Sequence, residues 1–151
     1  MSPAERREKC TEALDNCAAF SLRKSARLVG QHFDEALQSL GLKTTQVTLL
    51  MLVDTHPASP MHVIAEAAGL SPSTLSRNLQ PLVKNGLIEV TGSNRAGKHA
   101  TLTRKGSRLV EKAFPIWTQV QTEFSDAFGD AAWTRLRNAL NKANSAVGNL
   151  D

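Results

Sequence analysis

The sequence of 151 residues contains no tyrosine, and aromatic residues make up only 5% of it. Proteins that bind single-stranded nucleic acid stack the bases on aromatic side chains, so this scarcity disfavours such a surface. No run of about 18 apolar residues is present, and we therefore expect no membrane-spanning helix. The first ten residues, MSPAERREKC, lack the apolar stretch of a signal peptide, which disfavours secretion.

Cysteine is scarce as well, with only Cys10 and Cys17 in the chain. Two cysteines without a signal peptide do not form a disulfide framework, and they favour a cytoplasmic location. If both lay on one continuous helix, their rise of about 10 Å would exclude a disulfide between them. Two interpretations stay open: Cys17 is a small interior residue, or the two thiols respond to oxidants, with a bond across a dimer as one route.

Metal-binding and catalytic patterns are also lacking. His32, Asp34 and Glu35 lie close together in the sequence, but no histidine pair at i, i+4 and no cysteine cluster has the spacing of metal ligands. No nucleophile motif or glycine-rich phosphate loop occurs, since the glycines 69, 86 and 97 occupy turn positions. We therefore predict no metal, no cofactor and no enzymatic activity.

Positive charge is concentrated in the middle of the chain. The net charge is +4, yet residues 43–108 hold eight basic and three acidic residues, a net charge of +5. The two flanks together hold ten basic and eleven acidic residues. A basic centre between nearly neutral flanks is typical of a module that binds a polyanion, although a solvated basic face is an equal alternative on charge alone.

Hydrophobic periodicity predicts a mainly α-helical chain with one small β-hairpin. We expect a first helix over about 12–40, ended by Gly41, and a second that begins with Thr44 or Thr45 as its cap. A short helix over 61–68 and a helix over about 72–85 follow, the latter capped by Ser71 with Pro72 at its first position. Two strands, 87–90 and 98–103, form the hairpin, and two helices over about 104–128 and 130–147 complete the chain.

The order of these elements is that of a winged helix-turn-helix. A short helix, a turn at Gly69 and a capped second helix place the second helix where it can enter a major groove. The hairpin that follows can reach the neighbouring minor groove. We assign about 42–104 to this lobe within one domain that spans residues 1–151, with about 12–40 and 105–147 as dimerisation helices.

Three stretches carry a family resemblance, namely SPSTLSRNL at 71–79, LVKNGLI at 82–88 and LTRKG at 102–106. Together with GLKTTQ at 41–46 they resemble the MarR family of multiple antibiotic resistance regulators over about residues 12–147. The resemblance implies a homodimeric transcription factor that binds a palindromic operator in double-stranded DNA. Most members repress transcription, and many release DNA when a small, often aromatic, anionic compound binds.

The hairpin tip departs from the family pattern. Members often carry an acid and two arginines where this chain has Asn94, Arg95 and Ala96, so the usual acid–arginine support of the wing is reduced to Arg95. We therefore expect a more mobile wing than is typical. Hydrogen exchange as slow at the tip as in the core strands would contradict this expectation.

The candidate DNA contacts lie on the second helix of the motif and on the hairpin. Arg77 faces away from the apolar stripe of its helix and can fork to a guanine edge or a phosphate, or else form a surface salt bridge. Arg95 is the candidate for the minor groove. The full set is Ser71, Ser73, Thr74, Ser76, Arg77, Asn78, Lys84, Arg95 and Lys98.

The outer helices carry more apolar residues than a small winged-helix lobe can bury, which predicts a symmetric dimer rather than one monomeric core. An inducer pocket is expected between these helices and the lobe. Its candidate lining residues are Phe20, Arg23, His32, Met51 and Trp117, with Arg23 as the cation for an anionic aromatic ligand. The sequence thus predicts a ligand-responsive repressor. A redox-responsive repressor using Cys10 and Cys17, or a winged-helix module that binds proteins, remains the alternative.

Overall fold

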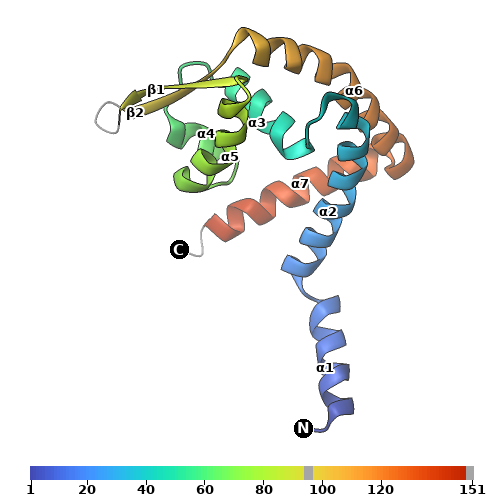
Figure 1. Ribbon diagram of the computed structural model, residues 1–151. Coiled ribbons are helices and arrows are strands. Elements are labelled where there is room, and N and C mark those ends of the chain that lie inside the picture. Colours follow the sequence, from blue (N-terminus) through green and yellow to red (C-terminus); the bar gives the residue numbers. More distant parts are fainter. Residues whose placement is uncertain (94–96, 149–151) are drawn as a thin grey trace.

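The structure, a computed structural model, describes residues 1–93 and 97–148. Within these residues helices dominate and the two strands form one antiparallel hairpin, which confirms the predicted fold class (Figure 1). The elements are α1 (Pro3–Asp15), α2 (Ala18–Ala36), the 3-10 helix η1 (Leu37–Leu40), α3 (Thr44–Thr55), α4 (Met61–Ala67), α5 (Pro72–Lys84), β1 (Ile88–Ser93), β2 (Gly97–Leu102), α6 (Arg104–Phe128) and α7 (Asp130–Gly148).

The hydrophobic core lies in the lobe built from α3, α4, α5 and the hairpin. Leucine and other aliphatic residues from each of these elements are almost fully buried, and α6 adds Ala113 to the same cluster. The stripe predicted on α5 is among them, with Leu75, Leu79 and Leu82 at 1% exposure or less. This burial fixes which face of α5 points to solvent, because the opposite face carries its polar residues.

The chain begins differently from the expected single helix over 12–40. A separate helix, α1, occupies residues 3–15, and the backbone is extended at Cys17 before α2 begins. Asn16 is the C-cap of α1, and its side-chain amide donates to the Glu12 carbonyl at 3.0 Å. The start of α1 carries a capping box, in which Ser2 and Glu5 each satisfy the other's backbone N–H. The prediction of one continuous helix was wrong here, and the Ser-Pro-x-Glu signal was missed.

The start of α3 is stabilised from another helix and not by the expected threonine cap. Thr44 is the first residue of α3, and its backbone N–H donates to Oδ1 of Asp34 in α2 at 2.6 Å. The second carboxylate oxygen lies 3.4 Å from Nζ of Lys43. These contacts, first the hydrogen bond from the Thr44 backbone, lower the pKa of Asp34 below its ordinary value.

Replacing Asp34 by alanine should therefore destabilise the protein in a pH-dependent way. At pH 7 the free energy of unfolding should fall by about 1 kcal/mol, as for loss of a helix cap. A carboxyl whose pKa is lowered by folding stabilises the fold above its unfolded-state pKa of about 4, and this contribution is lost as the pH falls. Urea unfolding at fixed protein concentration should show the two proteins converging below pH 4. A difference that stays constant down to pH 2.5 would contradict this assignment.

The outer helices reach beyond the lobe. Helix α1 projects from the rest of the molecule, α2 meets the lobe where Asp34 bonds to the start of α3, and α7 turns back from the far end of α6 (Figure 1). No residue of α1 or α7 is fully buried. Two ring contacts join the outer helices. The ring centroids of Phe33 in α2 and Trp117 in α6 lie 4.8 Å apart, and those of Phe124 in α6 and Trp133 in α7 lie 5.5 Å apart in a T-shaped arrangement. Among the described residues, no helix is long and apolar enough to cross a bilayer.

Candidate nucleic-acid interface

Helix α5 presents its N-terminal end as a polar, exposed surface. Ser71 caps the helix, as predicted, by accepting the Thr74 backbone N–H at 3.2 Å. Its hydroxyl also lies 3.1 Å from that of Ser73 and 2.8 Å from that of Thr74. Three hydroxyls thus gather at the positive end of the helix dipole, where a phosphate is favoured. Ser71 acts chiefly as the cap, since one of its acceptor sites is already used.

The next turn of α5 carries the side chains that can read bases. Ser76, Arg77 and Asn78 are all exposed, while Leu75 and Leu79 on either side of them are buried. No ion pair of Arg77 is present among the described residues, so the surface salt bridge considered from the sequence is not formed within those ranges. An unpaired guanidinium on such a face is free to fork to a guanine or to a phosphate.

The hairpin lies beside α5 and, among its described residues, adds one further cationic group, Lys98. Strands β1 and β2 pair in register from Ile88 opposite Leu102 to Ser93 opposite Gly97. Lys98 is exposed near the distal end of β2. The tip residues Asn94, Arg95 and Ala96 lie outside the described residues, so the predictions for Arg95 and for the wing's mobility stay predictions.

A hollow lies between α5 and the hairpin on the surface of the lobe. Its volume is about 340 Å³, and lysines from both elements, Lys84 of α5 and Lys98 of β2, line it together with Ser76 and Gln80. If α5 occupies a major groove and the hairpin the adjacent minor groove, the sugar–phosphate strand between the grooves must pass between these elements. The ammonium groups of these two lysines can pair with the phosphates of such a strand.

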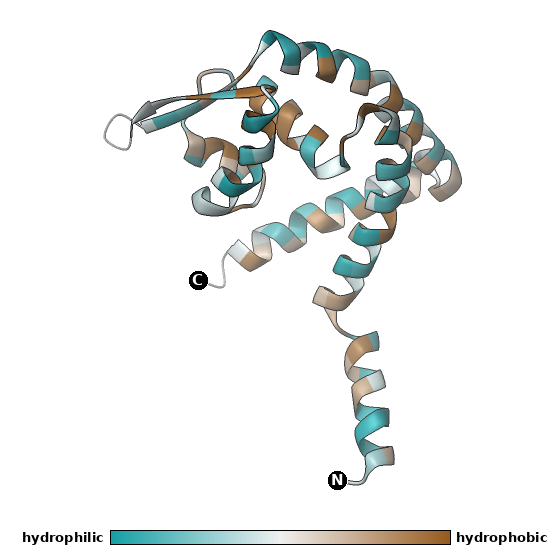
Figure 2. Ribbon diagram, viewed as in Figure 1, coloured by the Kyte–Doolittle hydropathy of each residue, from teal (hydrophilic) through white to brown (hydrophobic). Residues whose placement is uncertain are grey.

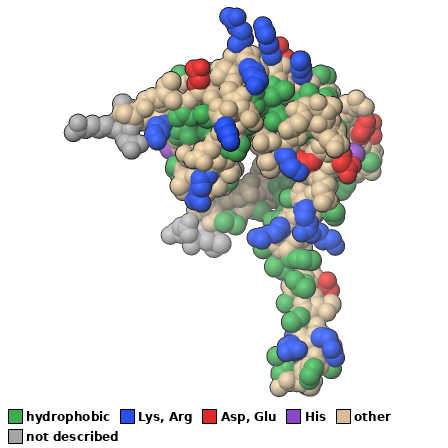
Figure 3. Space-filling model, in the orientation of Figure 1, with side chains coloured by type: hydrophobic (Ala, Val, Ile, Leu, Met, Phe, Trp, Pro, Cys, Tyr) green, Lys and Arg blue, Asp and Glu red, His purple; other side chains and the backbone are tan. Residues whose placement is uncertain are grey.

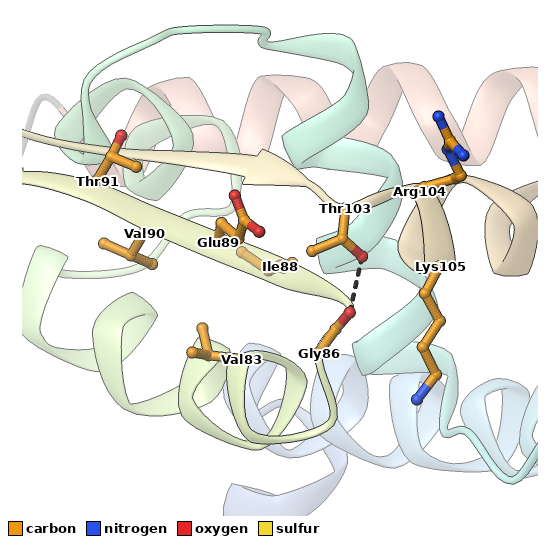
Figure 4. A pocket seen from close by; sticks show the side chains of 9 residues that line it. All are labelled: Val83, Gly86, Ile88, Glu89, Val90, Thr91, Thr103, Arg104 and Lys105. Carbon is orange, nitrogen blue, oxygen red and sulfur yellow. Dashed lines mark hydrogen bonds between the residues drawn. The ribbon is translucent and has the colours of Figure 1, made fainter.

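The junction of α5, β1 and α6 holds these parts at fixed positions. The Thr103 hydroxyl donates to the Gly86 carbonyl at 2.7 Å, as Figure 4 shows, and it also caps α6 by accepting the Gly106 backbone N–H at 3.0 Å. Nζ of Lys105 donates to the Asn85 carbonyl at 2.8 Å. The end of α5 and the start of α6 are therefore tied to one another by side chains.

A second basic region lies along the first half of α6. Lysine and arginine side chains stand on this part of the molecule (Figure 3). They line a groove of about 450 Å³ that is floored by Leu87 and Leu109 and bordered by Arg104, Lys105, Arg108 and Lys112. This region adjoins the C-terminal end of α5, whereas the base-reading candidates are at the N-terminal end of that helix.

Comparison with known proteins agrees with this arrangement. The family model described as MarR family matches residues 40–99. The M. tuberculosis transcriptional regulator MosR in complex with DNA is 34% identical, with a TM-score of 0.79 over 88% of this chain and 97% of that one. The chain belongs to the MarR family. It is therefore a member of a family of DNA-binding transcriptional regulators and not of enzymes.

More distant MarR-type structures share the fold. CouR of Rhodococcus jostii RHA1 bound to p-coumaroyl-CoA is 23% identical, with a TM-score of 0.71 over 87% of this chain and 94% of that chain. The S. aureus MepR–DNA complex is 20% identical, with a TM-score of 0.73 over 88% of this chain and 98% of that chain. A comparison with curated protein sequences found no match.

The five candidate ligand residues of this MarR-family chain are spread over several places. Phe20 is exposed and lines a shallow hollow at the α1–α2 junction together with Leu14, while Arg23 is exposed on α2. Nε2 of His32 lies 3.9 Å from a carboxylate oxygen of Glu123. Met51 and Trp117 pack at the edge of the core. Within one protomer, the described hollows do not bring these five side chains together.

The two thiols occupy different elements. Cys10 is exposed on α1, and Cys17 is half-buried at the start of α2, where its Sγ accepts the Phe20 backbone N–H at 3.4 Å. Both are free thiols. The helix break at Asn16 removes the premise that both lie on one continuous helix. Cys17 is a helix cap and not the interior residue that the sequence suggested.

Some residues that shape this interface were not identified from the sequence. Asp34 and Lys43 act through contacts between elements, so no local pattern distinguishes them. Thr103 and Gly106 had a signal, because both lie in the quoted LTRKG stretch. Thr103 is the cap of α6, and Gly106 is needed because a Cβ atom there would lie 2.1 Å from the Leu87 carbonyl oxygen.

Proposed function

We propose that this protein is a homodimeric repressor that binds a palindromic site in double-stranded DNA and releases it when a small aromatic or anionic compound binds. The observation that carries the proposal is the capped, polar N-terminal half of α5, held beside a basic hairpin. Exposed Ser73, Ser76, Arg77 and Asn78 would face base edges, and Ser71 and Thr74 would lie near phosphate. Lys84 and Lys98 would hold the intervening strand.

Exposed apolar side chains on the outer helices support the dimer. Hydrophobic residues recur along α1, α2, α6 and α7 outside the lobe (Figure 2). Leu28 is 55% exposed, Phe114 61% and Val147 64%. Water-exposed patches of this kind mark interfaces, and a symmetric partner would bury the same patch on both chains. Two-fold symmetry would also place two α5 helices about 34 Å apart, one turn of B-DNA.

The dimer gives a direct prediction. Sedimentation equilibrium at micromolar concentration should return twice the 16.4 kDa chain mass. Replacing Leu28 on α2 by glutamate should weaken association, because a charge would have to be buried in the shared apolar face. Replacing exposed Gln31 on the same helix by glutamate adds the same charge and serves as the control for general effects on α2. A monomeric mass for the unmodified chain would contradict the dimer.

The effector is proposed to act on the separation of the two α5 helices. Phe20, Arg23, His32, Met51 and Trp117 remain the candidate contacts, now with a partner chain needed to complete the site. A ligand that binds better to the form with misplaced α5 helices would shift the population away from DNA. CouR, bound to p-coumaroyl-CoA in one structure and to a 23-mer duplex in another, supports a search among aromatic acids and their thioesters.

A redox response is the second candidate function, favoured by one observation. Cys10 is exposed on a helix that buries none of its residues, so an oxidant can reach it. Mild peroxide treatment followed by mass spectrometry and a DNA-binding assay tests this. Loss of binding that is abolished in Cys10→Ser and Cys17→Ser would support it. Unchanged binding after full oxidation of Cys10 would exclude it.

Selection of bound duplexes from a random pool tests the main proposal. We expect an enriched inverted repeat with half-sites about 10 base pairs apart. Measuring binding to the most enriched duplex in the presence of small aromatic acids should then identify a compound that lowers the affinity. A protein-binding module would enrich no sequence.

A further inference from the structure

The loop between α3 and α4 is fastened to the hairpin by one side chain. Ala58 in this loop has φ +58°, and no other non-glycine residue within the described ranges has a positive φ. A left-handed alanine is disfavoured and persists only where its surroundings hold it. Its carbonyl oxygen lies 3.0 Å from Nδ1 of His99 in β2, forty-one residues further along the chain. Because a carbonyl can only accept, Nδ1 of His99 carries the hydrogen.

A backbone contact lies next to this hydrogen bond. Pro60 and His99 form an isolated antiparallel bridge, so the loop runs beside β2 at this point. The other end of the loop is held by His56, whose Nδ1 bonds to the Leu52 carbonyl at 2.8 Å. A two-stranded hairpin alone is marginally stable in water, so its direction depends on such attachments to the lobe.

The two neighbouring residues of β2 serve opposite faces of the hairpin. Successive side chains in a strand alternate, and Lys98 lines the hollow shared with α5 whereas His99 bonds to the loop. Fixing His99 therefore also fixes the face that carries Lys98. Because Nδ1 of His99 is held by the Ala58 carbonyl, a DNA contact by His99 itself would have to use Nε2.

We propose that His99 is a positioning residue, whose hydrogen bond to the Ala58 carbonyl sets the hairpin at a fixed angle to α5. The inference rests on the proposed function, since the angle matters because both elements must reach adjacent grooves of one duplex. The left-handed turn at Ala58 directs the carbonyl toward β2. Helix α5 and the paired strands of the hairpin are thereby held in one orientation, short of the tip at 94–96, and Lys98 meets its phosphate without a further ordering cost.

Three variants test the role of the donor. His99→Ala removes the hydrogen bond, whereas His99→Asn places an amide nitrogen where Nδ1 lies and restores a donor. His62→Ala is the control, since His62 is exposed on neighbouring α4 and makes no hydrogen bond within the described ranges. In the DNA-free protein, His99→Ala should speed hydrogen exchange of β1 and β2 amides by about fivefold, the effect of one hydrogen bond, with α5 unchanged. His99→Asn and His62→Ala should match the unmodified chain.

Binding to the selected duplex gives the functional readout. His99→Ala should bind about fivefold more weakly, and its footprint should lose protection at the outer minor grooves while the major-groove protection given by α5 remains. His99→Asn should restore both. Equal defects in His99→Asn and His99→Ala, or a uniform loss of protection, would overturn the proposal. If neither the unmodified chain nor any variant binds DNA, the proposed function fails. Unchanged hydrogen exchange of β1 and β2 in His99→Ala would separately overturn the positioning role of the His99–Ala58 hydrogen bond.

Discussion

Replacing Gly106 by alanine should destabilise the protein by about 2 kcal/mol, although alanine is the better helix former. Gly106 lies in the first turn of α6 and is buried. An added Cβ would lie 2.1 Å from the Leu87 carbonyl oxygen, a backbone atom that already accepts the Thr103 N–H at 3.0 Å. Because that carbonyl cannot turn aside without breaking its bond, α6 must move away from the end of α5. Urea unfolding at fixed protein concentration measures the loss.

Gly30 provides the matched control for this substitution. It also lies inside a helix, α2, but apart from the adjoining backbone of that helix no atom of the described residues lies within 4 Å of the position its Cβ would take. Gly30→Ala should therefore leave stability unchanged or raise it by up to about 1 kcal/mol. The same unfolding midpoint for Gly106→Ala and the unmodified chain would show that α6 and Leu87 are not packed as described.

Replacing Arg77 by alanine should weaken binding to the selected duplex by about 1–3 kcal/mol, a loss of roughly 5–150-fold. Arg77 is exposed on the polar face of α5 and forms no ion pair within the described residues. If its guanidinium forks to a guanine, the variant should also lose its preference at one position of each half-site. Titrations against duplexes that carry single base changes distinguish this from a phosphate contact, for which the loss is the same for every duplex.

Arg108 provides the control for loss of positive charge. It is an exposed arginine on α6 that borders the groove of Leu87 and Leu109, outside the hollow between α5 and the hairpin. Arg108→Ala should lower affinity less than about threefold, because one remote charge is largely screened at physiological salt. An Arg77→Ala protein that binds as tightly as the unmodified chain would remove α5 from the interface.

Local sequence signals predicted these helices well, because the residues that start them and that define their buried faces lie in or next to the helices themselves. Ser71 and Pro72 start α5 where expected, the apolar period of α5 identifies its buried face, and α6 spans the predicted residues. These features depend on neighbours three or four positions away. They can therefore be predicted from a single sequence.

Contacts between distant residues could not be predicted in the same way. The cap of α3 comes from Asp34, ten residues earlier and on another helix, so the choice between Thr44 and Thr45 was wrong. The His99–Ala58 bond joins residues forty-one positions apart. The break at Asn16 and Cys17 was missed for another reason. The apolar residues after it continue a helical period, which hides the interruption.

The salt dependence of binding to the selected palindrome tests the central claim most directly. The account predicts two chains for each duplex and a steep linear fall of the logarithm of the binding constant with the logarithm of salt concentration, because Lys84, Lys98 and the start of α5 displace counterions from phosphates. A duplex with only one half-site should bind far more weakly. Binding that is indifferent to salt, or equally tight on a single half-site with one chain bound, would contradict it.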